Sequence, residues 1–195
     1  IWGDDYGSEE NVRAAYDKSL ELLGLEYLDL YLIHWPGQDK QKYIDTWKGM
    51  EKIYQEGLVR AIGVSNFEPH HLESLFEQTS VIPAVDQVEY HPMLTQEPLH
   101  QFLQEKGIVM EAWSPLMRGG ELLGNETITK IAEKYNKTSA QVILRWDLQN
   151  SVITIPKSIT PSRIRENADI FDFALTNTEM AEISNLNENR RISVG

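Results

Sequence analysis

The sequence has no cysteine, no long apolar run and few basic residues. The lack of cysteine among 195 residues excludes disulfides and thiol catalysis. It is also typical of a reducing compartment, so we expect a cytoplasmic protein. No apolar run reaches the roughly 20 residues that a membrane-spanning helix needs, and no signal-peptide pattern opens the chain. We therefore expect no membrane association.

Positive charge is scarce as well. Lysine and arginine number 18 against 30 acidic residues, which gives a net charge of -12. Such a field repels polyanions, so a nucleic-acid partner is not expected and any anion site must be local. A hydrophobic content of 41% is ordinary for a globular protein, and no linker interrupts residues 1–195, which we interpret as a single domain without an internal boundary.

A glycine-rich dinucleotide fingerprint is also absent. Apolar segments of strand length alternate with helical patterns at intervals of roughly 25 to 45 residues, which is typical of βαβ units. The predicted strands are residues 27–36, 58–64 (broken by Gly63), 84–88, 108–112 and 151–155. Both an open doubly wound sheet and part of a (β/α)8 TIM barrel fit, although the missing fingerprint weakens the first.

The stretch YLDLYLIHWP, residues 27–36, organises this pattern. It is apolar on both faces, which predicts a parallel strand covered by helices on both sides. On a period of two, Leu28, Leu30, Leu32 and His34 share one face. His34 ends the strand, where parallel α/β folds carry their chemistry. A lone histidine there is more often structural, so a functional role depends on the other strand ends.

Those other ends are polar too. The five predicted strands finish with His34 and Trp35, Ser65 and Asn66, Gln87, Trp113 and Ser114, and Lys157 and Ser158. Each could be a solvated loop start, but together they predict one polar site lined with aromatic rings.

A basic window follows the last predicted strand. Residues 148–165 contain no acidic residue but include Lys157, Arg163 and Arg165, and Thr160 with Pro161 predicts a helix start among them. Free backbone N–H groups beside cations favour phosphate binding. The alternative is an ordinary basic helix face.

Five motifs carry a resemblance to a known family: GLEYLDLYLIHWP (24–36), VRAIGVSNF (59–67), VDQVEYHP (85–92), AWSPL (112–116) and IPKSITPSRIREN (155–167). Through them the chain resembles the aldo-keto reductases over almost its whole length. The resemblance implies a (β/α)8 barrel without a Rossmann domain, NADP(H) as the cofactor, reduction of small aldehydes and ketones, and a monomeric full-length protein.

The resemblance also implies roles for individual residues. His34 resembles the catalytic histidine that orients the substrate carbonyl, and Trp2 and Trp35 resemble substrate-pocket aromatics. The residues that resemble cofactor contacts are Ser65, Asn66 and Gln87 at the nicotinamide carboxamide, Trp113 stacked on the ring, Ser114 and Leu116 at the pyrophosphate, Lys157, Ser158 and Arg163 at the 2′-phosphate, and Glu166 and Asn167 at the adenine. No metal site is implied.

Part of the family pattern is not matched. The family's aspartate, tyrosine acid and lysine fall before Ile1, so the chain resembles strands four to eight of the barrel with their helices. We therefore expect an N-terminally truncated, incomplete barrel that lacks its proton donor and is inactive alone. Two other functions stay open: a non-catalytic NADP(H)-binding module, and a metal-dependent hydrolase with His34, Glu89, His91 and Glu111 as ligands.

Overall fold

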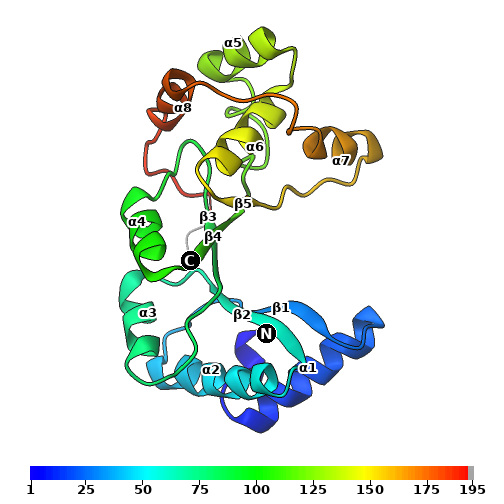
Figure 1. The fold of residues 1–195 in the computed structure, drawn as a ribbon, viewed down its shortest axis with the longest axis vertical. Coiled ribbons are helices and arrows are strands. Elements are labelled where there is room, and N and C mark those ends of the chain that lie inside the picture. The colour runs from blue at the N-terminus through cyan, green and yellow to red at the C-terminus, as the bar shows by residue number, and fades with distance from the viewer. Residues whose placement is uncertain (193–195) are drawn as a thin grey trace. The chain divides into compact units, whose positions relative to one another are not determined.

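The computed structural model describes residues 1–192 and shows an α/β protein (Figure 1). The chain forms two compact units. Unit 1 comprises residues 1–87 and 99–109, and unit 2 comprises residues 88–98 together with those from 110 onward. The single-domain organisation stays a prediction.

Helices and strands alternate along the chain in the predicted rhythm. The strands are β1 (Leu28–Ile33), β2 (Val59–Ser65), β3 (Val85–Glu89), β4 (Val109–Trp113) and β5 (Ile153–Thr154). The helices are η1 (Gly3–Asp5), α1 (Glu9–Leu23), α2 (Lys40–Gln55), α3 (Pro69–Phe76), α4 (Glu97–Lys106), α5 (Glu126–Tyr135), α6 (Ser139–Gln149), α7 (Pro161–Ala168) and α8 (Asn177–Ser184). No helix within residues 1–192 is both long and apolar enough to cross a membrane.

β1 pairs with β2, β2 with β3, and β4 with β5, all in parallel as predicted. In unit 1, Ile33 lies opposite Val64, and Ser65 lies opposite Gln87. In unit 2, Ala112 lies opposite Thr154. Because parallel strands end at the same edge, this register brings the polar residues at the ends of β1 and β2 next to Gln87 of β3.

Gly63 does not break its strand, contrary to the sequence-based expectation. β2 runs through it without interruption from Val59 to Ser65. A Cβ atom at Gly63 would lie 2.6 Å from the carbonyl oxygen of Val85 and 2.7 Å from a methyl carbon of Leu32. Glycine is therefore required by the close approach of neighbouring strands.

The fifth strand is shorter than the predicted 151–155. Ser151 adopts a left-handed conformation with φ of 61°, and the Val152 N–H donates to the carbonyl of Asp147 at 3.0 Å. Both residues thus close the C-terminal end of α6, and only Ile153 and Thr154 remain in the strand.

Towards its carboxyl end, β1 is buried more fully on one face than on the other. Tyr31 and Ile33 are buried, and the ring of Tyr31 meets that of Tyr16 on α1 edge to face at 5.9 Å. Leu30 and Leu32, on the face that leads to His34, are half-buried in the described structure.

Local helix signals were predicted correctly. Ser8 caps α1 by accepting the Asn11 N–H, and Gly24 ends that helix with φ of 65°. Asn125 caps α5. The capping boxes predicted at Thr138 and Thr176 begin α6 and α8, with Gln141 and Glu179 as the returning side chains.

Each unit has its own apolar centre. In unit 1, Trp47 and Ile44 of α2, Leu72 of α3 and Ile33 of β1 are fully buried. In unit 2, the buried Trp146 of α6 stacks on Tyr90, with ring centroids 5.0 Å apart and planes 13° apart. Such interlocked rings anchor α6, which also begins at the edge of the cleft described below.

Tyr6 ties the first turn of the chain to the end of β1. Its hydroxyl donates to the carbonyl of Trp35 at 2.7 Å and accepts the Trp35 N–H at 3.0 Å, and its side chain is buried. The backbone at the end of β1 is thereby held at both the N–H and the carbonyl of Trp35.

We expect Tyr6→Phe to lower the free energy of unfolding by about 1 to 3 kcal/mol, because it leaves two partly buried backbone groups without their partner. Urea denaturation followed by circular dichroism measures the change. Tyr54→Phe is the matched control, since Tyr54 lies at the exposed surface of α2 and should change stability by no more than about 0.5 kcal/mol. Equal effects of the two substitutions would contradict this role for Tyr6.

Candidate functional site

His34 lies at the carboxyl end of β1 beside an aromatic ring. The rings of Trp2 and His34 are 3.9 Å apart, and Trp2 is 66% exposed. Burial lowers the pKa of His34 below its ordinary value. His34 is therefore a neutral imidazole near pH 7, which carries one N–H donor.

Ser65, Asn66 and Gln87 are joined to His34 by hydrogen bonds at neighbouring strand ends. The Ser65 hydroxyl donates to the carbonyl of Gln87 at 2.7 Å, and the Asn66 N–H donates to the same oxygen at 2.9 Å. The Asn66 side-chain amide donates to the His34 carbonyl at 3.1 Å and to the Ser65 hydroxyl at 3.0 Å. The predicted residues of unit 1 therefore form one cluster.

This cluster depends on a left-handed residue. Asn66 has φ of 62°, a conformation that asparagine tolerates better than most residues. The next N–H, that of Phe67, points to Oδ1 of Asp86 at 3.4 Å. Asp86 is fully buried, and burial raises the pKa of its carboxyl well above the ordinary value. This supporting carboxyl was missed by sequence analysis, because an acidic residue inside a predicted strand gives no local signal of its partner.

The other predicted residues lie in unit 2, where Trp113 ends β4 and is half-buried. A cleft of about 900 Å³ opens in this unit. Its walls include all seven predicted contacts that follow Trp113, namely Ser114, Leu116, Lys157, Ser158, Arg163, Glu166 and Asn167. The cleft thus brings together the residues assigned to the pyrophosphate, the 2′-phosphate and the adenine.

Three cations line the cleft. Lys157 and Arg163 were predicted, and Arg118 was not. Within residues 1–192, none of the three has an acidic side chain within ion-pair distance. Unpaired cations that converge on one cleft of an acidic protein are the local anion site that the charge balance required. Arg118 could have been found from its place five residues after Trp113, at the end of a predicted strand.

The loop that carries Arg118 has an unusual backbone. Ser114, Met117 and Arg118 have φ values of 50°, 50° and 58°, and Gly119 and Gly120 also have positive φ. The N–H of Met117 donates to the Ser114 carbonyl, and that of Gly119 to the Leu116 carbonyl. Non-glycine residues in this conformation are uncommon, and they cluster at binding sites.

The predicted helix start lies at the rim of the same cleft. α7 begins at Pro161 after Thr160, whose side chain makes no capping hydrogen bond. Instead the Thr160 N–H donates to the Ser158 hydroxyl at 3.2 Å. No acidic residue occupies the first turn, so the positive end of the helix dipole is not neutralised locally.

A metal centre does not assemble among the described residues. Within residues 1–192, no group of three or more histidine, aspartate or glutamate side chains is placed to hold an ion. Glu89 and His91, two of the candidate ligands, are buried partners of each other, with Oε1 and Nε2 2.9 Å apart. The Ile192 N–H also donates to Glu89 Oε1 at 2.7 Å.

These features define a parallel α/β protein with polar strand ends and a cationic cleft. The model of the aldo/keto reductase family matches residues 2–188. The chain is 58% identical over 192 residues to the glyoxal reductase of Bacillus subtilis, covering 98% of this chain and 68% of that relative. The chain belongs to the aldo/keto reductase family.

Solved structures agree with this assignment. An aldo-keto reductase from a Medee basin deep-sea metagenome library superposes with a TM-score of 0.96 at 43% identity, over 100% of this chain and 72% of that one. An aldo-keto reductase of Bombyx mori, solved in complex with NADP, superposes with a TM-score of 0.92 at 38% identity, over 100% of this chain and 68% of that one.

Proposed function

We propose that the protein is an oxidoreductase that reduces small aldehydes and ketones by hydride transfer from NADPH. The observation that carries this proposal is the cleft of unit 2, where Arg118, Lys157 and Arg163 converge without acidic partners. Membership of the family and the NADP complex of the Bombyx mori relative support it. Glyoxal is the first substrate to test, because the Bacillus subtilis relative is named for it.

In this proposal, residues of each unit contact a different part of the cofactor. In unit 1, Ser65, Asn66 and Gln87 hold the nicotinamide carboxamide. In unit 2, Trp113 stacks on the ring, and the cleft residues bind the phosphates and the adenine. NADPH supplies the hydride, and the protein holds and orients it.

His34 orients the substrate. Its neutral imidazole donates a hydrogen bond to the carbonyl oxygen, which polarises the carbonyl for hydride attack. Within the described residues neither ring nitrogen has a hydrogen-bond partner, so the donor is available. Trp2 and Trp35 flank it as substrate-pocket aromatics.

The proton donor, in our proposal, comes from a segment outside these 195 residues. Hydride transfer leaves an alkoxide, which needs a nearby acid. Tyr6 is already committed to both polar groups of Trp35, and Tyr31 is buried on the opposite face of β1. A tyrosine on an additional strand of a complete barrel is the donor that the family pattern implies.

The first prediction concerns the 2′-phosphate. Arg163→Ala should weaken NADPH binding about tenfold or more and barely change NADH binding, because a charge-assisted contact contributes roughly 1.5 to 3 kcal/mol. Isothermal titration of both cofactors measures this. Arg165→Ala is the matched control, since Arg165 lies on the same helix outside the cleft. Equal losses for NADPH and NADH would refute the assignment of Arg163.

The second prediction concerns the carbonyl. In the protein extended upstream of Ile1, His34→Ala should lower turnover about 100-fold while NADPH affinity changes little, because the proposed contact is to the substrate. Trp113→Ala should do the reverse, since a stacked ring contributes directly to cofactor binding. Cofactor titration and steady-state kinetics separate the two. A collapse of NADPH affinity in a folded His34→Ala protein would show that His34 lies elsewhere in the site.

The third prediction concerns the proton donor. The chain of residues 1–195 should not reduce glyoxal with NADPH, whereas a version extended upstream of Ile1 should. Well-placed acid catalysis contributes roughly 10²- to 10⁴-fold, and an incomplete barrel also leaves sheet edges open. Absorbance of NADPH and light scattering measure both effects. Turnover by a monodisperse monomer of the shorter chain would overturn this view, and NADPH binding without turnover by the longer one would favour a binding module.

A further inference from the structure

Helix α7 carries the proposed nucleotide contacts but has almost no packing of its own. It has eight residues and none of them is buried. Ile164, its central apolar side chain, is 53% exposed. A helix this short is marginal in water, so something other than apolar burial must fix its place beside the cleft.

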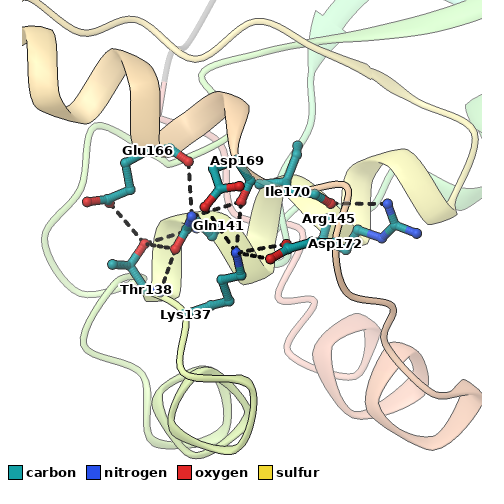
Figure 2. A network of polar contacts seen from close by, with 8 residues as sticks. All are labelled: Lys137, Thr138, Gln141, Arg145, Glu166, Asp169, Ile170 and Asp172. Carbon is teal, nitrogen blue, oxygen red and sulfur yellow. Dashed lines mark hydrogen bonds and ion pairs between the residues drawn. The ribbon is translucent and has the colours of Figure 1, made fainter.

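The support comes from the N-terminal turn of α6 (Figure 2). Gln141 points its side-chain amide at the end of α7, where Nε2 donates to the carbonyl of Glu166 at 3.1 Å and to that of Asp169 at 2.9 Å. The Glu166 carbonyl lies in the last turn of α7, where it also accepts the Asp169 N–H at 3.0 Å, and the Asp169 carbonyl belongs to the residue that ends the helix. Gln141 is itself buried, so both bonds are partly shielded from water.

Neighbouring side chains strengthen the same contact. The Thr138 hydroxyl lies 3.0 Å from Oε1 of Glu166, and Lys137 forms ion pairs with Asp169 at 3.1 Å and Asp172 at 2.8 Å. Arg145, one turn further along α6, donates to the Ile170 carbonyl at 3.1 Å (Figure 2). All of these bonds reach the C-terminal end of α7 and the residues after it.

The identity of residue 141 is informative. In a capping box the returning side chain only accepts, and glutamate or glutamine serves equally. Here Oε1 of Gln141 accepts the Thr138 N–H at 3.0 Å. The amide nitrogen is not needed for the cap, and it is this atom that holds α7. Glutamate would keep the cap and lose both bonds to α7.

We propose that Gln141 is a positioning residue of the nucleotide site: it holds α7 so that Arg163, Glu166 and Asn167 face the cleft. This inference rests on the proposed function. It predicts that Gln141 controls affinity for the adenine and 2′-phosphate end of the cofactor while the chemistry at the nicotinamide end is unchanged.

Two substitutions of Gln141 test it. Gln141→Glu keeps the cap but adds a charge, and Gln141→Met stays neutral but loses the cap acceptor. Both should weaken NADPH and 2′,5′-ADP about 5- to 10-fold, the size expected for one or two lost hydrogen bonds. In the protein extended upstream of Ile1, the turnover number of both variants at saturating NADPH should stay within about twofold of the unsubstituted protein, because no group at the reacting atoms is changed.

The control is Thr176→Val, which removes the corresponding cap of α8, a helix with no residue in the cleft. It should leave the dissociation constants for NADPH and 2′,5′-ADP within about twofold of wild type, although it too removes a capping hydrogen bond. Thermal unfolding of all three variants shows whether each is folded. The dissociation constants of Gln141→Glu and wild type are compared at low and at high salt, because repulsion between the added carboxylate and the phosphates weakens as ionic strength rises.

The outcomes distinguish failure of the proposed role of Gln141 from failure of the proposed function. Binding of 2′,5′-ADP by Gln141→Met within twofold of wild type would overturn the role of Gln141. So would a loss in Gln141→Glu that disappears at high salt, or an equal loss in Thr176→Val. If wild type binds neither NADPH nor 2′,5′-ADP, the proposed function itself fails.

Discussion

The candidate site of unit 1 depends on hydrogen bonds between the ends of adjacent parallel strands. Asn66 reaches back to the His34 carbonyl, and both Ser65 and the Asn66 backbone converge on the Gln87 carbonyl. A parallel sheet places successive side chains on alternate faces, so a slip of one residue would turn His34 or Gln87 away from this cluster. The close approach at Gly63 fixes that register, because β2 can lie against β1 and β3 only where no Cβ intervenes.

Unit 2 meets a different physical demand. A chain with a net charge of -12 repels a phosphate-bearing ligand unless cations are gathered locally and kept unpaired. Elsewhere in the described chain, basic side chains such as Arg190 and Lys137 are taken up by ion pairs with carboxylates. Arg118, Lys157 and Arg163 are not, and they face one cleft.

Much of the fold could be predicted because its signals are local. The caps at Asn125, Thr138 and Thr176 follow from side-chain chemistry within one turn, and the parallel strands follow from apolar runs between helical patterns. The sequence-based predictions were wrong where a residue distant in the sequence determines the local structure. Nothing local distinguishes a glycine that breaks a strand from one, like Gly63, that a neighbouring strand requires. The role of Tyr6 likewise depends on Trp35, 29 residues away.

The same reasoning explains why the motif at 155–167 was recognised and its support was not. Lys157 and Arg163 are visible as charges, but Gln141 reads as an ordinary cap residue until the end of α7 is placed beside it. Because α7 has no buried residue, its order depends on a few polar bonds, and a nucleotide that contacts Arg163 would add to them. Nucleotide binding and ordering of the helix are then thermodynamically coupled. Each bond from α6 that is already formed reduces the entropic cost of ordering α7 that the binding free energy must offset. A short helix that is held at its C-terminal end can therefore contribute to tight nucleotide binding without being part of the hydrophobic core.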